Sequence, residues 1–214
     1  MFSALRTPQE RKSLMNERIQ PLEIPGALLV EAAGSADERG GFFEYLRAAD
    51  LQAAGCGLEV AQVNCSVSVR GALRGIAVTA VPPAQAKVVA CVAGAVLDVA
   101  VDLRAGSPSF GTWHAEWLGQ GRRAALVLPP GVGHAFLSLA GGSAVVYLLS
   151  HPNDPGLERR VNPLDPDIGI AWPPEITPVM SPRDASAPGL RESLEAGLLP
   201  DYSACLAAGQ HKAR

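Results

Sequence analysis

The sequence predicts a mainly β protein, built as an antiparallel sandwich or barrel. Short apolar segments recur along the chain, separated by Gly- or Pro-containing turns about every 8–12 residues. Several are rich in β-branched residues and alternate in polarity, which is the period of a strand. In AVLDVAVDL, for example, Asp98 and Asp102 fall on one face. The composition, 48% hydrophobic and 18% charged over 214 residues, is that of a globular chain with one substantial core.

The expected elements follow the apolar segments in order. Residues 1–19 are polar and are expected to form an N-terminal extension, followed by a single domain over 20–214. A short helix is predicted near 45–54, and one or two helices within 187–209. Eight strands are predicted, at 27–33, 59–69, 86–94, 95–103, 112–118, 124–131, 134–140 and 143–150.

Charge and hydropathy argue against several classes of function. The net charge of −3 gives no basis for nucleic-acid binding. No apolar run approaches the roughly 18 residues of a membrane span, and the first residues lack an apolar signal core, so a cytoplasmic location is expected. The four cysteines form no C-x-x-C pair and are expected to be buried or half-buried thiols.

One short motif points to a particular kind of barrel. PPGVGHAF contains the pattern P-x-G-x-x-H, from Pro129 to His134, and this resembles the second motif of the cupins. The first cupin metal motif needs an H-x-H pair, which this chain lacks, and its four histidines are scattered. Because a mononuclear metal needs three or four converging ligands, neither a metal nor another cofactor is expected.

Seven segments in a fixed order make the resemblance more specific. Together they resemble the dTDP-4-dehydrorhamnose 3,5-epimerase family over roughly residues 20–205. The segments are DERGGFFE (37–44), QVNCSVS (62–68), LRGI (73–76), PPAQAKVV (82–89), VDLRAGSPSFGTW (101–113), PPGVGHAF (129–136) and LDPDIGIAWP (164–173).

This resemblance implies a fold, a partner and a substrate class. The fold is a metal-free, cupin-type antiparallel jelly-roll barrel, here followed by short C-terminal helices. The family forms homodimers in which an N-terminal strand crosses to the neighbour and completes its site. The family substrate is a small molecule, a 4-keto-6-deoxyhexose carried on thymidine diphosphate. We therefore expect a homodimer with a small-molecule substrate.

The family chemistry removes a proton beside a ketone and returns it from the opposite face. It needs a base, an acid, and a donor or cation for the developing oxyanion. In the family these are a histidine supported by an aspartate, a tyrosine, and a lysine. The resemblance assigns the acid to Tyr147, the supporting aspartate to Asp184 and the lysine to Lys87. The base position falls on Ala77, after LRGI, and a methyl group accepts no proton.

The resemblance also assigns residues that bind the substrate. Arg39 and Arg74 match the arginines that hold the diphosphate, a role suited to bidentate guanidinium groups. Asn153 falls where the family usually stacks an aromatic ring on thymine, and Ala135 replaces a usual glycine. Phe42 and Glu44 match base-contacting residues donated by the partner subunit, and the other matched pocket positions are Gln62, Asn64, Glu158 and Arg183.

Three functions remain open on the sequence. The first is a diverged isomerase of deoxysugar or secondary-metabolite biosynthesis, impaired in 3,5-epimerisation, whose base is His134 or a water held by Asp184. The second is an epimerase fold recruited as a cyclase, dehydratase or isomerase for a non-sugar natural-product intermediate. The third is a non-catalytic protein that binds a nucleotide sugar.

Each singled-out side chain also has a structural interpretation. Tyr147 would then be a core tyrosine, and His134 a histidine at the pocket rim. Asp184 would be a helix cap or an ion-pair partner of Arg183. Asp98 and Asp102 would point into the barrel or into ion pairs.

Overall fold

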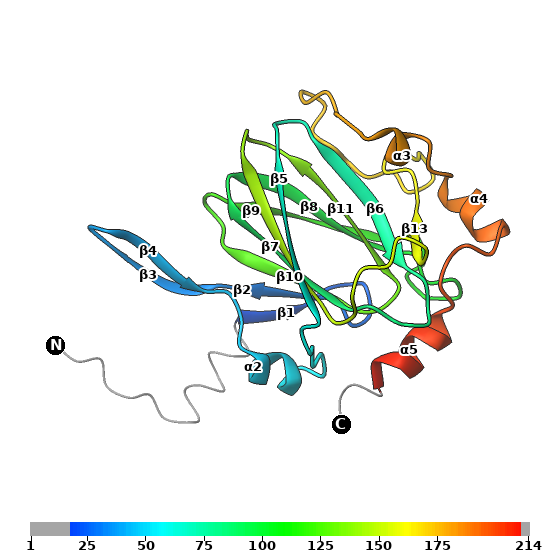
Figure 1. Ribbon diagram of the computed structural model, residues 1–214, viewed down its shortest axis with the longest axis horizontal. Coiled ribbons are helices and arrows are strands. Elements are labelled where there is room, and N and C mark those ends of the chain that lie inside the picture. Colours follow the sequence, from blue (N-terminus) through cyan, green and yellow to red (C-terminus); the bar gives the residue numbers. More distant parts are fainter. Residues whose placement is uncertain (1–17, 211–214) are drawn as a thin grey trace.

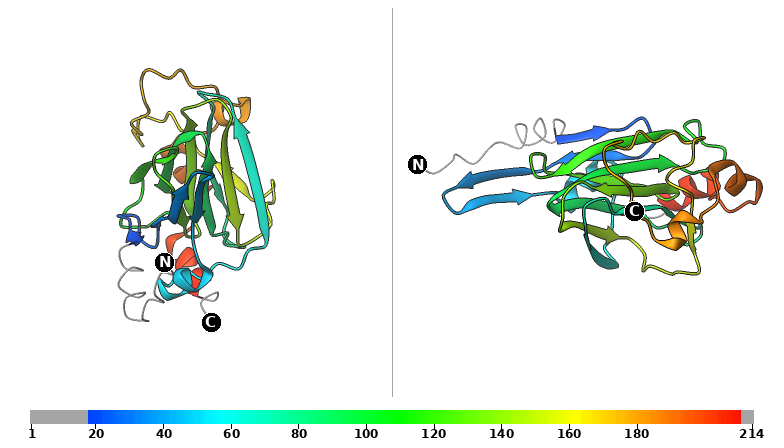
Figure 2. Two further views of the ribbon diagram at one scale, coloured as in Figure 1. Left: turned by 90° about the vertical axis from the view of Figure 1, so that its left-hand side faces the viewer. Right: turned by 90° about the horizontal axis from the view of Figure 1, so that it is seen from above.

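The protein folds into two antiparallel sheets that face each other, as Figures 1 and 2 show. The computed structural model describes residues 18–210. The predicted extension over 1–19 therefore lies outside the described residues, apart from its last two positions. The mainly β, cupin-type architecture that the sequence predicts is confirmed.

The first sheet has six strands in the order β1–β2–β10–β7–β12–β5, and neighbouring strands pair antiparallel. Its strands combine segments from the start, middle and end of the barrel sequence. They are β1 (Ile19–Pro21), β2 (Leu28–Glu31), β10 (Ala124–Leu128), β7 (Lys87–Ala93), β12 (Ser143–Leu149) and β5 (Gln62–Ser68).

The second sheet has five strands in the order β13–β6–β11–β8–β9. Strand β6 is absent from the predicted strands, because Arg74 and Gly75 interrupt its apolar pattern. The short strand β13 is also absent from the predicted strands, since its three residues are all polar and show no alternation of apolar and polar side chains. The strands are β13 (Glu158–Arg160), β6 (Leu73–Thr79), β11 (Val132–Ser138), β8 (Ala95–Asp102) and β9 (Trp113–Gly119).

The space between the sheets is filled by apolar side chains over part of its length. Val89 and Val145 come from the six-stranded sheet, and Ala100 and Phe136 from the five-stranded sheet. These residues alternate with outward-facing neighbours along their strands, as the pleat requires. Polar side chains replace them toward the ends of β6, β7 and β12, and a cavity opens there.

Helices and loops cover parts of the outer faces. Helix α2 (Ala48–Ala53), shorter than the predicted 45–54, packs Leu51 against the six-stranded sheet. The segment around Ile168, Ile176 and Leu190 covers the five-stranded sheet. Two helices occupy the segment for which one or two were predicted, α4 (Leu190–Glu195) and α5 (Tyr202–Gln210), and a further short helix, α3 (Pro182–Ala185), precedes them.

Two features leave apolar groups exposed. The hairpin of β3 (Ala33–Asp37) and β4 (Gly40–Glu44) projects from the barrel, as Figure 1 shows, and Phe42 near its tip is 80% exposed. Strand β5 is the last strand of its sheet, and its outward-facing Val63 and Val67 are exposed.

Candidate active site

A cavity of about 630 Å³ lies between the two sheets. Both sheets, the loop after β12 and the start of α3 contribute side chains to it. The lining residues are Val63, Asn64, Cys65, Ser66, Arg74, Gly75, Ala77, Gln85, Lys87, His134, Phe136, Tyr147, Leu149, Asn153, Glu158, Arg160, Ser181 and Asp184.

One wall of the cavity is a row of three residues across the five-stranded sheet. Ala77 on β6 is the register partner of His134 on β11 and of Arg160 on β13. Directly opposed residues of antiparallel strands point to the same face, with Cβ atoms about 4.5–5.5 Å apart. All three line the cavity, so the methyl group of Ala77 lies between an imidazole and a guanidinium.

The facing wall carries Tyr147 and Lys87. Tyr147 on β12 pairs with Asn64 on β5, and its hydroxyl lies 3.4 Å from that of Ser66. Burial raises the pKa of Tyr147, which keeps its phenol protonated at neutral pH. The ring of His134 meets the ring of Tyr147 edge-on, with centroids 5.6 Å apart. A protonated donor therefore faces the wall that carries Ala77.

Lys87 is a buried amine at the start of β7, where it is the register partner of Leu149 on β12. Burial lowers its pKa to about 8, with the charge of Glu158 opposing this effect and that of Arg160 adding to it. Only 8% of the residue is exposed. Below that pH the ammonium offers a positive charge to an oxyanion in the cavity, and above it the amine is neutral.

His134 is held by a carboxylate from the neighbouring strand. Its Nε2 lies 2.8 Å from Oδ1 of Asp98, a residue with no exposed surface. Within residues 18–210, Oδ2 of Asp98 has no hydrogen-bond partner. In the tautomer whose Nε2–H donates to Asp98, Nδ1 retains the lone pair that accepts a proton. Of the two aspartates that the sequence places on one face, Asp98 thus contacts His134, and Asp102 pairs with Arg104 at 2.8 Å.

The carboxylate of Asp184 contacts two side chains, and the sequence predicts neither contact. Its Oδ2 accepts from the Ser181 hydroxyl at 2.8 Å, and its Oδ1 is ion-paired with Arg160. The cap of helix α3 is Ser181, whose hydroxyl accepts from the Asp184 amide. Asp184 is therefore not the cap, and Arg183 pairs with Glu158 at 3.1 Å instead of with Asp184.

Polar residues at the opening of the cavity hold one another. Gln62 donates to Asn64 at 2.7 Å and accepts from the backbone amide of Asn153 at 2.9 Å. Arg74 donates through Nε to Ser68 at 3.2 Å. These contacts order the opening and leave the rest of the Arg74 guanidinium exposed on the cavity side.

Five of the sequence-predicted residues do not line this cavity within one chain, and one of them is Gln62, which contacts the lining residue Asn64. Arg39 pairs with Asp37 in the exposed turn of the β3–β4 hairpin, at 2.6 Å, and Phe42 lies on β4 close to that turn. Glu44, at the base of the hairpin, pairs with Arg18 and Arg47. Arg183 lines a second, smaller depression, to which Glu158 and Arg160 also contribute. That the hairpin residues complete a partner's cavity stays a prediction.

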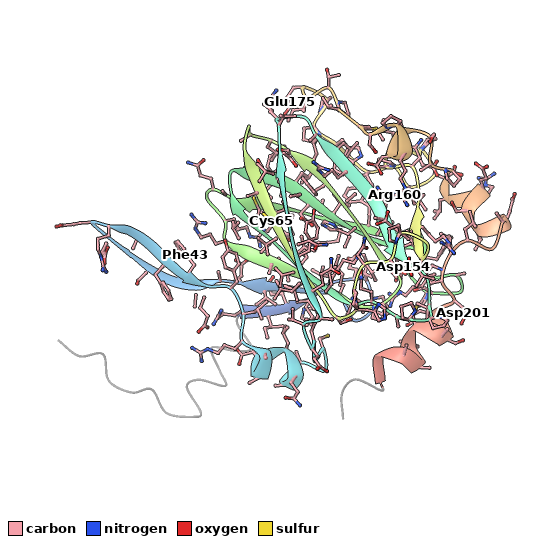
Figure 3. The ribbon with its side chains drawn as sticks, viewed as in Figure 1. Phe43, Cys65, Asp154, Arg160, Glu175 and Asp201 are labelled. Atoms are coloured by element: carbon pink, nitrogen blue, oxygen red, sulfur yellow. The ribbon has the colours of Figure 1, made fainter. Side chains whose placement is uncertain are left out.

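Arg160 and Gln85 line the cavity but are not among the residues that the sequence predicts. Gln85 lines the cavity, accepts from Thr79 at 3.1 Å and donates to the carbonyl of His151 at 2.9 Å. Arg160 lies beside another arginine in a short polar segment, and only the register of β13 reveals that it faces Ala77. Figure 3 marks Arg160 beside β6.

Neither a metal cluster nor a membrane span emerges from the described part of the chain. Over residues 18–210, no three or more His, Cys, Asp or Glu side chains are grouped so that they could hold a metal ion. No helix in this range combines the length and the apolar character that crossing a membrane requires.

Comparisons with known proteins point in one direction. Residues 21–192 match the family model described as dTDP-4-dehydrorhamnose 3,5-epimerase. A Streptomyces griseus protein of that name is 50% identical over 190 residues, or 88% of this chain and 94% of that protein.

Solved structures give the same result. One is ChmJ, a 3'-monoepimerase from Streptomyces bikiniensis in complex with dTDP-quinovose, at 48% identity and a TM-score of 0.86, covering 91% of this chain and 98% of that one. Another is NovW, a 4-keto-6-deoxy sugar epimerase from the novobiocin gene cluster of Streptomyces spheroides, at 46% identity and a TM-score of 0.84, covering 88% and 94%.

Proposed function

Because this chain belongs to the dTDP-4-dehydrorhamnose 3,5-epimerase family, an enzyme family of isomerases, we propose that it binds a dTDP-linked 4-keto-6-deoxyhexose and is a diverged epimerase. Its classical 3,5-epimerisation is impaired, because Ala77 occupies the position of the base. We assign it to deoxysugar or secondary-metabolite biosynthesis, since relatives such as NovW belong there.

One observation carries the proposal: Ala77 lies on the cavity wall that faces Tyr147. A proton-transfer acid and an ammonium remain on the six-stranded sheet, as Tyr147 and Lys87. On the opposite wall, where the family base belongs, the side chain is a methyl group. Removing a positioned general base costs about 10²–10⁴ in rate, so the expected effect is a slow reaction in a well-formed pocket.

Any remaining proton abstraction is assigned to His134. Among the described residues, the cavity lining holds one imidazole, that of His134, one strand away from Ala77 and on the same wall. Neighbouring strands lie about 4.8 Å apart. The imidazole of His134 would therefore be displaced by about that distance from the place of a base at position 77. A displaced base works more slowly than a positioned one, because proton transfer depends on the geometry of approach.

We also assign a homodimer to this protein. The hairpin that carries Arg39 and Phe42 projects from its own barrel. In a dimer, this hairpin would extend to the cavity of the neighbouring subunit. The exposed valines of β5 supply an apolar surface next to the cavity, of the kind that oligomer interfaces bury.

The test is deuterium wash-in from heavy water into dTDP-4-keto-6-deoxyglucose, read by mass spectrometry. The unmodified protein should exchange protons beside the ketone about 10²–10⁴ times more slowly than the S. griseus relative. His134→Gln should lower the remaining exchange further, and Tyr147→Phe should block return of the proton without affecting binding. Exchange as fast as in the relative would refute the impairment.

Binding is measured separately, by calorimetry with dTDP and dTDP-glucose. Binding with no exchange in any variant would favour the non-catalytic alternative. Failure of both nucleotides to bind the folded protein would reject the dTDP-sugar assignment and favour a recruited enzyme with another substrate.

A further inference from the structure

The partner of Asp184 is a guanidinium where an imidazole would be expected. We propose that Arg160 has replaced the missing base as the partner of Asp184, and that an imidazole reintroduced at position 77 stays inactive until Arg160 is removed. The inference rests on the proposed function in taking position 77 as the base position. It makes Arg160 a positioning residue that sets what this wall of the cavity can do.

The register of the five-stranded sheet brings the groups together. Arg160 on β13 is directly opposite Ala77 on β6, and both line the cavity. Helix α3, which carries Asp184, packs against β6. The small side chain at position 77 leaves room for the guanidinium to reach the carboxylate, which it contacts through Nη1.

The carboxylate needs such a partner because it is buried. Asp184 is 4% exposed, and a buried carboxylate is destabilising unless it is paired and hydrogen-bonded. Ser181 supplies one donor, at 2.8 Å from Oδ2. A methyl group at position 77 supplies none, and Arg160 meets the remaining need on Oδ1 with a full positive charge.

Arg160 is itself held in place. Its Nε and Nη2 donate to Oε1 of Glu158 at 2.9 and 2.6 Å, and 21% of its side chain is exposed. Arg183 adds a third contact to the same oxygen, at 3.1 Å. The network Arg183–Glu158–Arg160–Asp184 therefore keeps the guanidinium on the carboxylate, and moving it away would break several charge-assisted bonds at once.

This pairing changes what the wall can do. A guanidinium donates hydrogen bonds and does not accept a proton in proteins. An imidazole placed beside it would have a cation as neighbour, and both carboxylates that line the cavity, Asp184 and Glu158, are already paired with Arg160. Both effects oppose a general base, since a nearby positive charge disfavours imidazolium and an unoriented ring misplaces the lone pair.

The experiment compares Ala77→His, Arg160→Ala and the double variant. The control is Arg159→Ala in the Ala77→His background, because Arg159 is adjacent on β13 but does not line the cavity, and its hydrogen bonds go to backbone carbonyls. The first readout is an NMR titration of the introduced imidazole without substrate. The second is the deuterium wash-in rate.

With Arg160 present, the introduced imidazole should titrate below its ordinary pKa of about 6.5. Adding Arg160→Ala should raise that pKa by one unit or more, because Asp184 becomes its partner. The wash-in rate of the double variant should exceed that of Ala77→His at least tenfold, while the Arg159→Ala control should match Ala77→His in both readouts.

A raised pKa with fast exchange in Ala77→His alone would overturn the inference, as would equal pKa values with and without Arg160. If Arg160→Ala prevents folding, the test is the pKa of the introduced imidazole in Ala77→His alone. A pKa below its ordinary value supports the inference, and a raised pKa overturns it. If no variant binds the dTDP-sugar, the proposed function fails, and the substrate-free titration still decides whether Arg160 holds Asp184.

Discussion

Replacing His134 with leucine tests how far the cavity wall depends on the His134–Asp98 pair. The side chains of His134 and Asp98 are 7% and 0% exposed, and their contact is 2.8 Å long. Because Oδ2 of Asp98 lacks a partner in the described residues, His134→Leu would leave both carboxylate oxygens buried and unmatched. Breaking a buried pair in this way costs about 3–5 kcal/mol.

That cost is large against a typical stability of about 5–15 kcal/mol. It corresponds to a loss of roughly 150- to 5,000-fold in the ratio of folded to unfolded protein. For a chain of this size it lowers Tm by about 6–20 °C. The measurement is urea and thermal unfolding at one protein concentration, because subunit association makes apparent stability depend on concentration.

Two controls separate the pair from other effects. The double variant Asp98→Leu/His134→Leu should recover at least half of the loss, because two apolar groups replace a buried pair. His151→Leu should change stability by less than about 0.5 kcal/mol, since His151 lies outside the core and its ring contacts a nearby carbonyl. A folded His134→Leu variant within about 1 kcal/mol of the parent protein would refute the reasoning.

Three other experiments test the cavity and the dimer. Asn153→Tyr should tighten dTDP binding about two- to tenfold in calorimetry, because a stacked ring contributes ~0.5–1.5 kcal/mol. Arg74→Ala should weaken dTDP binding. If neither variant changes the affinity, the cavity is not a dTDP site. The wash-in rate should fall as pH rises through about 8, where Lys87 loses the proton that stabilises the oxyanion, and Lys87→Arg should remove this fall. Val67→Lys should shift sedimentation at micromolar concentration from dimer to monomer, while Val179→Lys, equally an exposed valine, should not.

Strands of both sheets were predictable where their side chains alternate. AVLDVAVDL and SAVVYLLS predict β8 and β12, because burial on one or both faces of a sheet selects apolar residues at fixed spacing. Strand β6 was not predictable in this way. It carries Arg74 and Gly75 within an apolar run, and its place between β13 and β11 depends on pairing with residues far along the chain.

The candidate site shows the same division. The family resemblance singles out Tyr147 and Lys87, the cupin-like motif contains His134, and all three residues line one cavity. The contacts of these residues were not predictable to the same extent. Asp98 is identified only as a residue that faces the barrel interior or an ion pair, and the structure places it on the imidazole of His134.

The fold class and the family could be predicted from the sequence alone, because both follow from local patterns and from the order of motifs. The partner of Asp184 could not, because it depends on tertiary contacts. Arg160 and Asp184 are 24 residues apart, and their contact depends on the register of β13 against β6 and on the position of α3. A one-residue shift in that register would turn Arg160 to the opposite face, since successive side chains of a strand alternate. Sequence patterns report which residues prefer burial, but side-chain partners depend on how distant strands align.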